Sequence, residues 1–190
     1  NAQDQRRVES HNDSSSSGPS KDGAAAAAND AGHGEKAETA SGPTAETIEL
    51  EVIDGPGFES LLKECRGRVV LVDFWATWCP SCVKQMPHTV ELHEKYHDQG
   101  LTVITVSLDD PESQDKILQV LRARDANMKN YVSAHGGSEK SMETFQIEGG
   151  LPHYQLYDRE GNLHRTFATG QENIDVEEIQ KGIIIKITSD

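Results

Sequence analysis

Apolar and polar residues change their spacing several times along this 190-residue chain, and each change marks an expected element of structure. Residues 47–52 alternate between polar and apolar, which predicts a strand with one face in water. Residues 69–75 form an apolar run with one acid inside it, the pattern of a central strand covered on both faces. Residues 101–108 repeat this pattern and predict a second buried strand.

Apolar residues at helical spacing separate these strands. They predict helices at residues 58–65, 79–97, 110–124, 139–145 and 174–187, with a turn over 54–57 before the first. A weak strand is expected near 130–133, and two more, 153–157 and 163–168, flank a DREGN turn and should form an antiparallel hairpin. The alternation of strands and helices predicts an α/β fold with a central mixed sheet flanked by helices.

The first 45 residues have a different composition. They contain no Leu, Ile, Phe, Tyr or Trp, and Val8 is their only large aliphatic residue. Such a segment buries too little apolar surface to offset the entropy lost on ordering. We therefore expect residues 1–45 to be a disordered linker or tether, and residues 46–190 to form one folded domain.

The net charge of −14 narrows the range of partners. Nucleic acids and anionic lipid surfaces both favour basic proteins, so neither is an expected partner. No apolar run approaches the roughly 18 residues that suggest a membrane span. The sequence begins at Asn1 rather than Met, and we expect that a signal peptide or anchor preceded it.

Cys79 and Cys82 form a Cys-Pro-Ser-Cys motif where a buried strand gives way to a helix. Free backbone N–H groups and the helix dipole at this position lower the pKa of Cys79, and the thiolate is the attacking species in disulfide exchange. Cys82, one turn further along, should be less exposed and resolve the mixed disulfide. Pro80 fits the first turn of a helix, and Ser81 is small enough to leave Cys79 accessible.

Two further side chains are candidates for this chemistry. Asp73 lies inside an apolar strand, where an acid is costly without a partner. We predict that Asp73 lies behind Cys82 and accepts its proton through water; the alternative is that the side chain reaches solvent at a sheet edge. Trp75 should pack in the core, whereas Trp78, next to Cys79, should form part of the substrate surface.

Residues 73–82, DFWATWCPSC, resemble the active-site signature of the thioredoxin superfamily, most closely its TlpA/ResA/DsbE-like branch. The resemblance covers residues 46–188 and implies a thioredoxin fold. Pro87 matches the proline inside the family's active-site helix. Leu151 and Pro152 resemble the family's cis-proline loop, which lies opposite the cysteines and pairs with an extended substrate.

This sequence departs from the branch at two positions. Asp73 stands where Asn is frequent in that branch, and His153 follows the loop proline where Thr is usual. A histidine near two thiols either stabilises a thiolate or, half-exposed, shapes the groove. Both interpretations remain open.

Three other functions compete with catalysis. Cys79 and Cys82 with His93 and His97 approach zinc-finger spacing, but about 16 Å of helix would separate the two pairs. Copper-delivery proteins of the same fold use a CxxxC pair with a distant histidine; the two-residue spacing here disfavours this function, although His153 keeps it open. A non-catalytic binding module often lacks one of the two cysteines, and both are present here. Cys65 is expected to be buried and inert.

The sequence thus predicts a thiol–disulfide oxidoreductase, more reductant than oxidant, that acts on protein thiols and disulfides and contributes to cell redox homeostasis. It should need no cofactor beyond the Cys79–Cys82 disulfide and no metal. We expect a monomer outside the cytoplasm, periplasmic or membrane-tethered, served by a membrane electron-transfer partner.

Overall fold

The computed structural model describes residues 47–169 and 175–189 of the chain. The elements are β1 (Glu51–Ile53), α1 (Gly55–Glu64), β2 (Val69–Trp75), α2 (Pro80–Tyr96), a 3₁₀ turn (His97–Gln99), β3 (Leu101–Ser107), α3 (Gln114–Arg122), β4 (Lys129–Ser133), α4 (Glu139–Thr144), β5 (Gly150–Tyr157), β6 (Leu163–Thr169) and α5 (Val176–Thr188). The disorder expected for residues 1–45 lies outside the described residues. Within them, no helix combines the length and the apolar character needed to cross a membrane.

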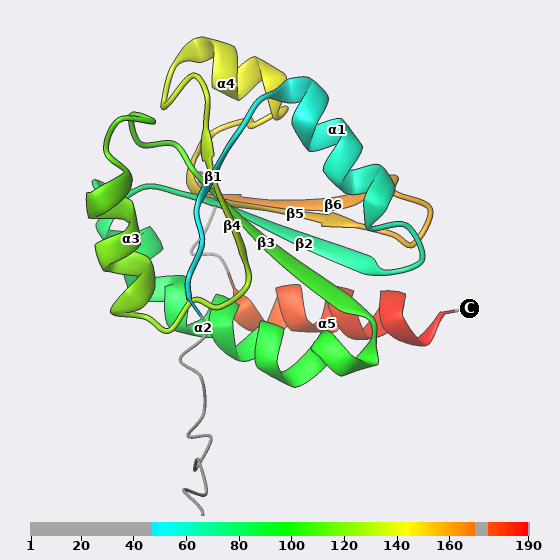
Figure 1. Cartoon of the computed structure of the whole chain (residues 1–190). Helices are drawn as coiled ribbons and strands as arrows, with labels where there is room; N and C mark the ends of the chain where they lie inside the picture. Colours follow the sequence, from blue (N-terminus) through cyan, green and yellow to red (C-terminus); the bar gives the residue numbers. More distant parts are fainter. Residues whose placement is uncertain (1–46, 170–174, 190) are drawn as a thin grey trace, which may run out of the picture. The chain divides into compact units, whose positions relative to one another are not determined.

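Six strands form one mixed sheet in the order β1-β4-β3-β2-β5-β6, as Figure 1 shows. β1, β4, β3 and β2 are parallel to one another. β5 runs antiparallel to β2, and β6 runs antiparallel to β5. The predicted mixed α/β architecture with a terminal hairpin is confirmed. β2 lies in the middle of the sheet, which explains why all seven of its residues are buried.

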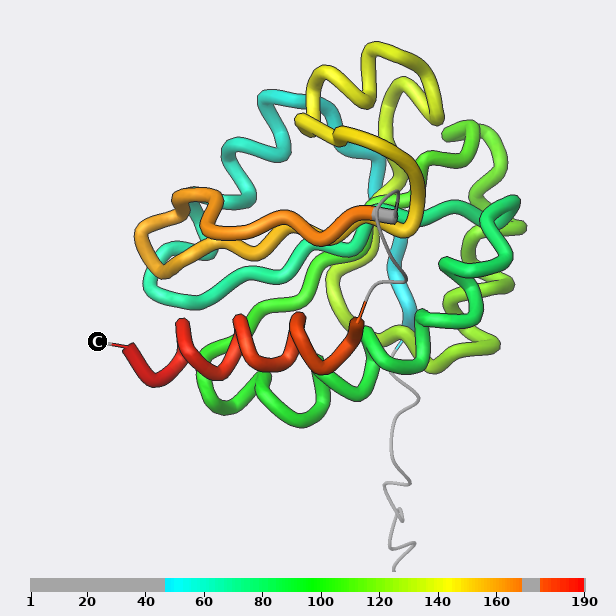
Figure 2. Tube along the Cα trace, turned by 180° about the vertical axis from the view of Figure 1, so that it is seen from behind, coloured from blue at the N-terminus to red at the C-terminus, as the bar shows by residue number. Residues whose placement is uncertain are grey.

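Helices cover both faces of the sheet. α2 and α5 lie along one face, and α1 and α4 lie on the other (Figures 1 and 2). Alternate residues of β2 pack against the helices on opposite faces of the sheet, because successive side chains of a strand point to opposite faces. Leu71 and Trp75 pack with α2, α3 and α5, whereas Val72 and Phe74 pack with α1.

The boundaries of several elements, among them α1, α3 and β1, differ from the sequence prediction. The expected turn at residues 54–57 is instead the start of α1: the Asp54 side chain accepts a 2.9 Å hydrogen bond from the Gly57 N–H and caps the helix, and Pro56 fits its first turn. The helix expected from residue 110 begins at Gln114, because the Ser113 N–H bonds back to the Asp110 carbonyl in a turn. The first strand is shorter, with Glu51–Ile53 alone in the ladder.

Candidate functional site

Cys79 and Cys82 lie at the start of α2 and are joined in a disulfide. Cys79 is the N-cap residue, and its sulfur accepts a hydrogen bond from the Cys82 N–H at 3.2 Å. Pro80 occupies the first helical position, where its missing N–H leaves no gap in the helix. Cys79 is 6% exposed and Cys82 is 2% exposed, so the expected order of accessibility is observed.

The residues around Cys79 give it a partly open surface. Pro80 and Ser81 are exposed, and the Ser81 hydroxyl lies 3.4 Å from the Cys79 sulfur. The two tryptophans differ as expected: Trp75 is fully buried, whereas Trp78 is 57% exposed immediately before Cys79. Trp78 therefore presents its indole to whatever approaches the sulfur.

Asp109, a residue that the sequence interpretation missed, holds the segment before Cys79 in place. Its carboxylate accepts hydrogen bonds from the Thr77 N–H at 2.7 Å and from the Thr77 hydroxyl at 2.6 Å. The Ser107 hydroxyl donates a third, also at 2.7 Å. Asp109 lies two residues after the end of β3, and β3 runs parallel to β2, so both strands end at the same edge of the sheet. The sequence signal that could have identified Asp109 is an acidic residue just after a strand predicted to be buried.

Asp73 lies on β2 and is 1% exposed, which contradicts the alternative of a solvent-reaching side chain at a sheet edge. Burial raises the pKa of its carboxyl to about 7, an effect opposed in part by hydrogen bonding to Thr89 and Tyr154. The Thr89 hydroxyl donates to one carboxyl oxygen at 2.7 Å. Asp73 is therefore a buried acid that titrates near neutral pH.

Polar groups lead from Asp73 toward the surface of α2. The Thr89 hydroxyl lies 3.4 Å from the Tyr154 hydroxyl, which also approaches the side-chain oxygen of half-buried Gln85 at 3.4 Å. Gln85 is one helical turn beyond Cys82, and Thr89 is two turns beyond it, about 10 Å along the axis. A proton moving between Cys82 and Asp73 would have to cover a distance of this order.

The Leu151–Pro152 peptide bond is cis, as the resemblance implied. β5 pairs with β2 so that His153 lies opposite Phe74, which places Pro152 beside the end of β2 that leads into Cys79. Leu151 is half-buried and packs against the hydrophobic cluster that contains both cysteines. The cis-proline loop and the disulfide therefore lie at the same edge of the sheet.

His153 does not lie where either sequence interpretation put it. Its ring is fully buried rather than half-exposed, so the side chain cannot contact a substrate. Tyr154 faces α2, and strand alternation turns His153 to the opposite face, against the Phe74 ring at 5.9 Å. This is the face away from Cys82 in the core, so the ring is not placed to stabilise a thiolate. Burial also lowers the pKa of His153.

The remaining candidates are the possible zinc ligands and Cys65. Among the described residues, no group of three or more His, Cys, Asp and Glu side chains is placed to hold a metal. The rings of His93 and His97 lie 5.0 Å apart, centroid to centroid, at the far end of α2. α2 is continuous from Pro80 to Tyr96, so these histidines are too far along its axis from Cys82 to share a metal with it. Cys65 is a buried free thiol, and its burial raises its pKa, as expected for an inert cysteine.

Comparisons with known proteins agree with this geometry. The profile of the Redoxin family matches residues 38–183. The thiol-disulfide oxidoreductase ResA of Bacillus thuringiensis subsp. konkukian is 30% identical over 132 residues, which cover 70% of this chain and 73% of that protein. ResA of Halalkalibacterium halodurans is 38% identical over 72 residues, or 38% of this chain and 40% of the relative.

Among solved structures, a putative thiol:disulfide interchange protein DsbE from Chlorobium tepidum superposes with a TM-score of 0.57 at 25% identity. The match covers 66% of this chain and 84% of that one. The chain spans 40% to 61% of the length of several ResA relatives that it matches.

Proposed function

This chain belongs to the Redoxin family, within the TlpA/ResA/DsbE type of the thioredoxin superfamily, and on that basis we propose that it is a thiol–disulfide oxidoreductase acting on proteins. The single observation that carries the proposal is the Cys79–Cys82 disulfide at the N-terminus of α2, with the exposed side chains of Trp78, Pro80 and Ser81 beside it. Such a pair takes up and returns two electrons without a metal or organic cofactor.

In the reducing direction, the reduced protein carries the Cys79 thiolate and the Cys82 thiol. The Cys79 sulfur attacks a substrate disulfide, and one substrate sulfur leaves as a thiolate and takes up a proton. The Cys82 sulfur, after losing its proton, attacks the mixed disulfide and releases the second substrate sulfur. The substrate gains two electrons and two protons, and the Cys79–Cys82 disulfide is re-formed.

Two features of the site favour Cys79 as the attacking sulfur. The Cys82 N–H already points at the Cys79 sulfur, and a hydrogen bond to a thiolate is stronger than one to a neutral sulfur. The positive end of the helix dipole lies at the same position. Both effects lower the pKa of Cys79 in the reduced protein.

Asp73 is proposed to receive the Cys82 proton. Its carboxyl is buried on the face of the sheet that packs against α2 and has a pKa of about 7, so it gains and loses a proton in the working range of such enzymes. Water would bridge the distance between the two groups. The Thr89 hydroxyl keeps the carboxyl facing α2.

Reduction requires a thiol donor to regenerate the dithiol, and we propose a membrane electron-transfer partner for this step. The family branch and the composition of residues 1–45 support a location outside the cytoplasm, on a tether. We further propose that the protein works as a monomer. The opposite direction, oxidation of a substrate dithiol, uses the same two cysteines.

Reduction of insulin in the presence of dithiothreitol tests the activity. Wild-type protein should accelerate the reaction, Cys79→Ala should abolish the acceleration, and Cys65→Ala, which changes a cysteine outside the motif, should preserve it. Cys82→Ala should accumulate mixed disulfides that mass spectrometry detects. Acceleration that survives Cys79→Ala, or its complete absence in wild type, would contradict the proposal.

A further inference from the structure

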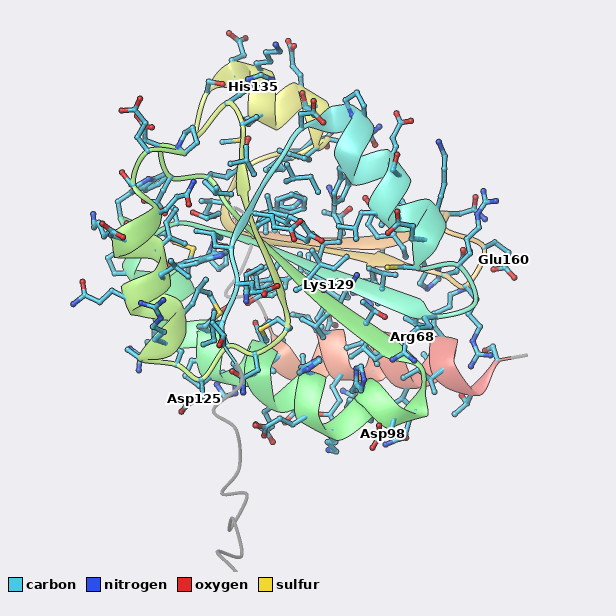
Figure 3. The ribbon with its side chains drawn as sticks, in the orientation of Figure 1. Arg68, Asp98, Asp125, Lys129, His135 and Glu160 are labelled. Atoms are coloured by element: carbon cyan, nitrogen blue, oxygen red, sulfur yellow. A yellow bond between two sulfur atoms is a disulfide. The ribbon has the colours of Figure 1, made fainter. Side chains whose placement is uncertain are left out.

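A cleft of about 440 Å³ lies beside the redox site. One wall is Trp78, the residue immediately before Cys79; the others are residues 108 and 110–111, which follow β3, and residues 134–137, which follow β4. Figure 3 shows His135 on the loop that leads into α4. Three loops from one edge of the sheet therefore line an open cleft that includes Trp78, the neighbour of Cys79 in the chain.

Side chains at two positions of the last loop would crowd the neighbouring backbone. A Cβ atom on Gly137 would lie 3.1 Å from the Leu108 carbonyl oxygen and 3.5 Å from the Trp78 ring. Gly136 has a φ of +55°, and a Cβ there would lie 3.3 Å from the Asp109 carbonyl oxygen. This loop therefore lies against the Trp78 ring and the end of β3, and it fixes the shape of the cleft.

The walls of the cleft combine an aromatic surface with a negative charge. Trp78 is 57% exposed, and Asp110 is exposed with its carboxylate oriented by a hydrogen bond from the Glu112 N–H at 2.9 Å. Among the residues described as lining the cleft, none is Lys or Arg. A guanidinium group stacks on an indole and donates paired hydrogen bonds to a carboxylate, so arginine matches both walls at once.

We propose that this cleft receives a basic side chain, arginine in preference to lysine, from the protein segment whose disulfide is exchanged at Cys79. The inference rests on the proposed function and adds a substrate preference to it. Trp78 and Cys79 are adjacent in the chain, so a side chain held in the cleft belongs within a few residues of the substrate cysteine. The net charge of −14 attracts the same class of segment from a distance.

Three disulfide-linked peptides that differ at one position test the preference. The position next to the cysteine carries Arg, Gln or Glu, and stopped-flow measurements give the second-order rate constant for attack by the reduced protein. Wild type should react about fivefold faster with the Arg peptide than with the Gln peptide, and slowest with the Glu peptide. Added salt should narrow the differences.

Two variants locate the effect. Asp110→Asn should reduce the Arg-to-Glu rate ratio toward one. Glu160→Gln removes an exposed charge from the β5–β6 turn, well away from His135 in Figure 3, and should keep the wild-type ratio. A lysine peptide should react at a rate between those of the Arg and Gln peptides.

The outcomes separate this inference from the proposed function. Equal rates for all three peptides, or a ratio that Asp110→Asn does not change, would overturn the cleft assignment while leaving the oxidoreductase activity intact. A faster rate for a further peptide with Leu at this position than for the Arg peptide would also overturn it. Failure to reduce any peptide, together with failure on a small aromatic disulfide, would contradict the proposed function itself.

Discussion

The Thr89 hydroxyl donates a 2.7 Å hydrogen bond to the Asp73 carboxyl, and both side chains are 1% exposed. This contact joins the central strand of the sheet to the helix that carries both cysteines. It shows that the Asp73 side chain lies on the face of the sheet that packs against α2.

Asp73→Asn should change the pH dependence of thiol exchange. Burial raises the pKa of Asp73 to about 7, so the carboxylate that accepts the Cys82 proton forms mainly above that pH. Resolution of the mixed disulfide should therefore slow by about ten- to a hundredfold at pH 8 in the variant, with a smaller change at pH 5.5. Rapid-quench trapping of the mixed disulfide across this range measures it, and coincident profiles would rule out the role.

The same substitution should stabilise the oxidised protein in neutral solution. Between pH 4 and pH 7, as an order-of-magnitude window, Asp73 ionises in the unfolded chain but remains protonated in the fold, so stability falls as pH rises through this range. Asp73→Asn removes the penalty and should add about 2–4 kcal/mol to the free energy of unfolding at pH 8, and little near pH 4. Urea denaturation of the wild type and of Asp73→Asn at both pH values measures this difference in the free energy of unfolding, and an equal difference at pH 4 and pH 8 would contradict the prediction.

Thr89→Val should destabilise the fold because it removes the donor to Asp73 without changing the side-chain volume much. The loss should be about 1.5–3 kcal/mol at pH 8, where the acceptor is charged, and about 1 kcal/mol at pH 5. Thr89→Ser, which keeps the hydroxyl, is the matched control. In the Asp73→Asn background the effect of Thr89→Val should not vary with pH, and persistent variation would point to another titrating group.

Asp109→Ala should weaken both the fold and the exchange reaction. It leaves the Thr77 N–H, the Thr77 hydroxyl and the Ser107 hydroxyl without their acceptor, at a cost of about 2–4 kcal/mol. The loosened segment carries Trp78 and leads into Cys79, so the rate constant with every disulfide substrate should fall. Glu112→Ala, at an exposed neighbouring acid, should do neither, and an unchanged melting temperature for Asp109→Ala would be evidence against its positioning role.

Cys65→Ala should leave exchange kinetics unchanged. The thiol is buried against α1 and β2 and burial raises its pKa, so it forms little thiolate at neutral pH. In native oxidised protein a thiol reagent should label no residue quickly, and after unfolding it should label Cys65 alone among the cysteines. Rapid labelling of Cys65 in the folded protein would contradict an inert role.

The sequence was most informative where chemistry and local pattern coincide. The apolar run of β2 and the helix start at Cys79 carry their own signals, because burial on both faces and helix capping act through neighbouring residues. The cis peptide at Pro152 was predictable only through the resemblance, since most X–Pro bonds are trans. The true start of α1 was also readable in retrospect from Asp54 followed by Pro56.

Contacts across the sheet were harder to predict. Asp109 and Thr77 are far apart in sequence, and only the parallel pairing of β2 with β3 brings them together. The position of His153 depends on which face of β5 packs against α2, which in turn depends on register. One residue of register exchanges the two faces of a strand, so this outcome follows from packing rather than from the local sequence.

The capping arrangement at α2 has a consequence for the energy of the two redox states. The Cys79 sulfur caps the start of α2 and accepts a hydrogen bond from the Cys82 N–H in the disulfide form. After reduction the same sulfur carries a negative charge when deprotonated, which makes it a stronger acceptor. Reduction therefore turns a weak cap into a strong one, and the first turn of α2 holds more tightly to its own end. The stronger cap stabilises the reduced protein and so favours the uptake of electrons. Residues that strengthen or weaken the first turn of α2 would therefore shift the reduction potential without contacting either sulfur.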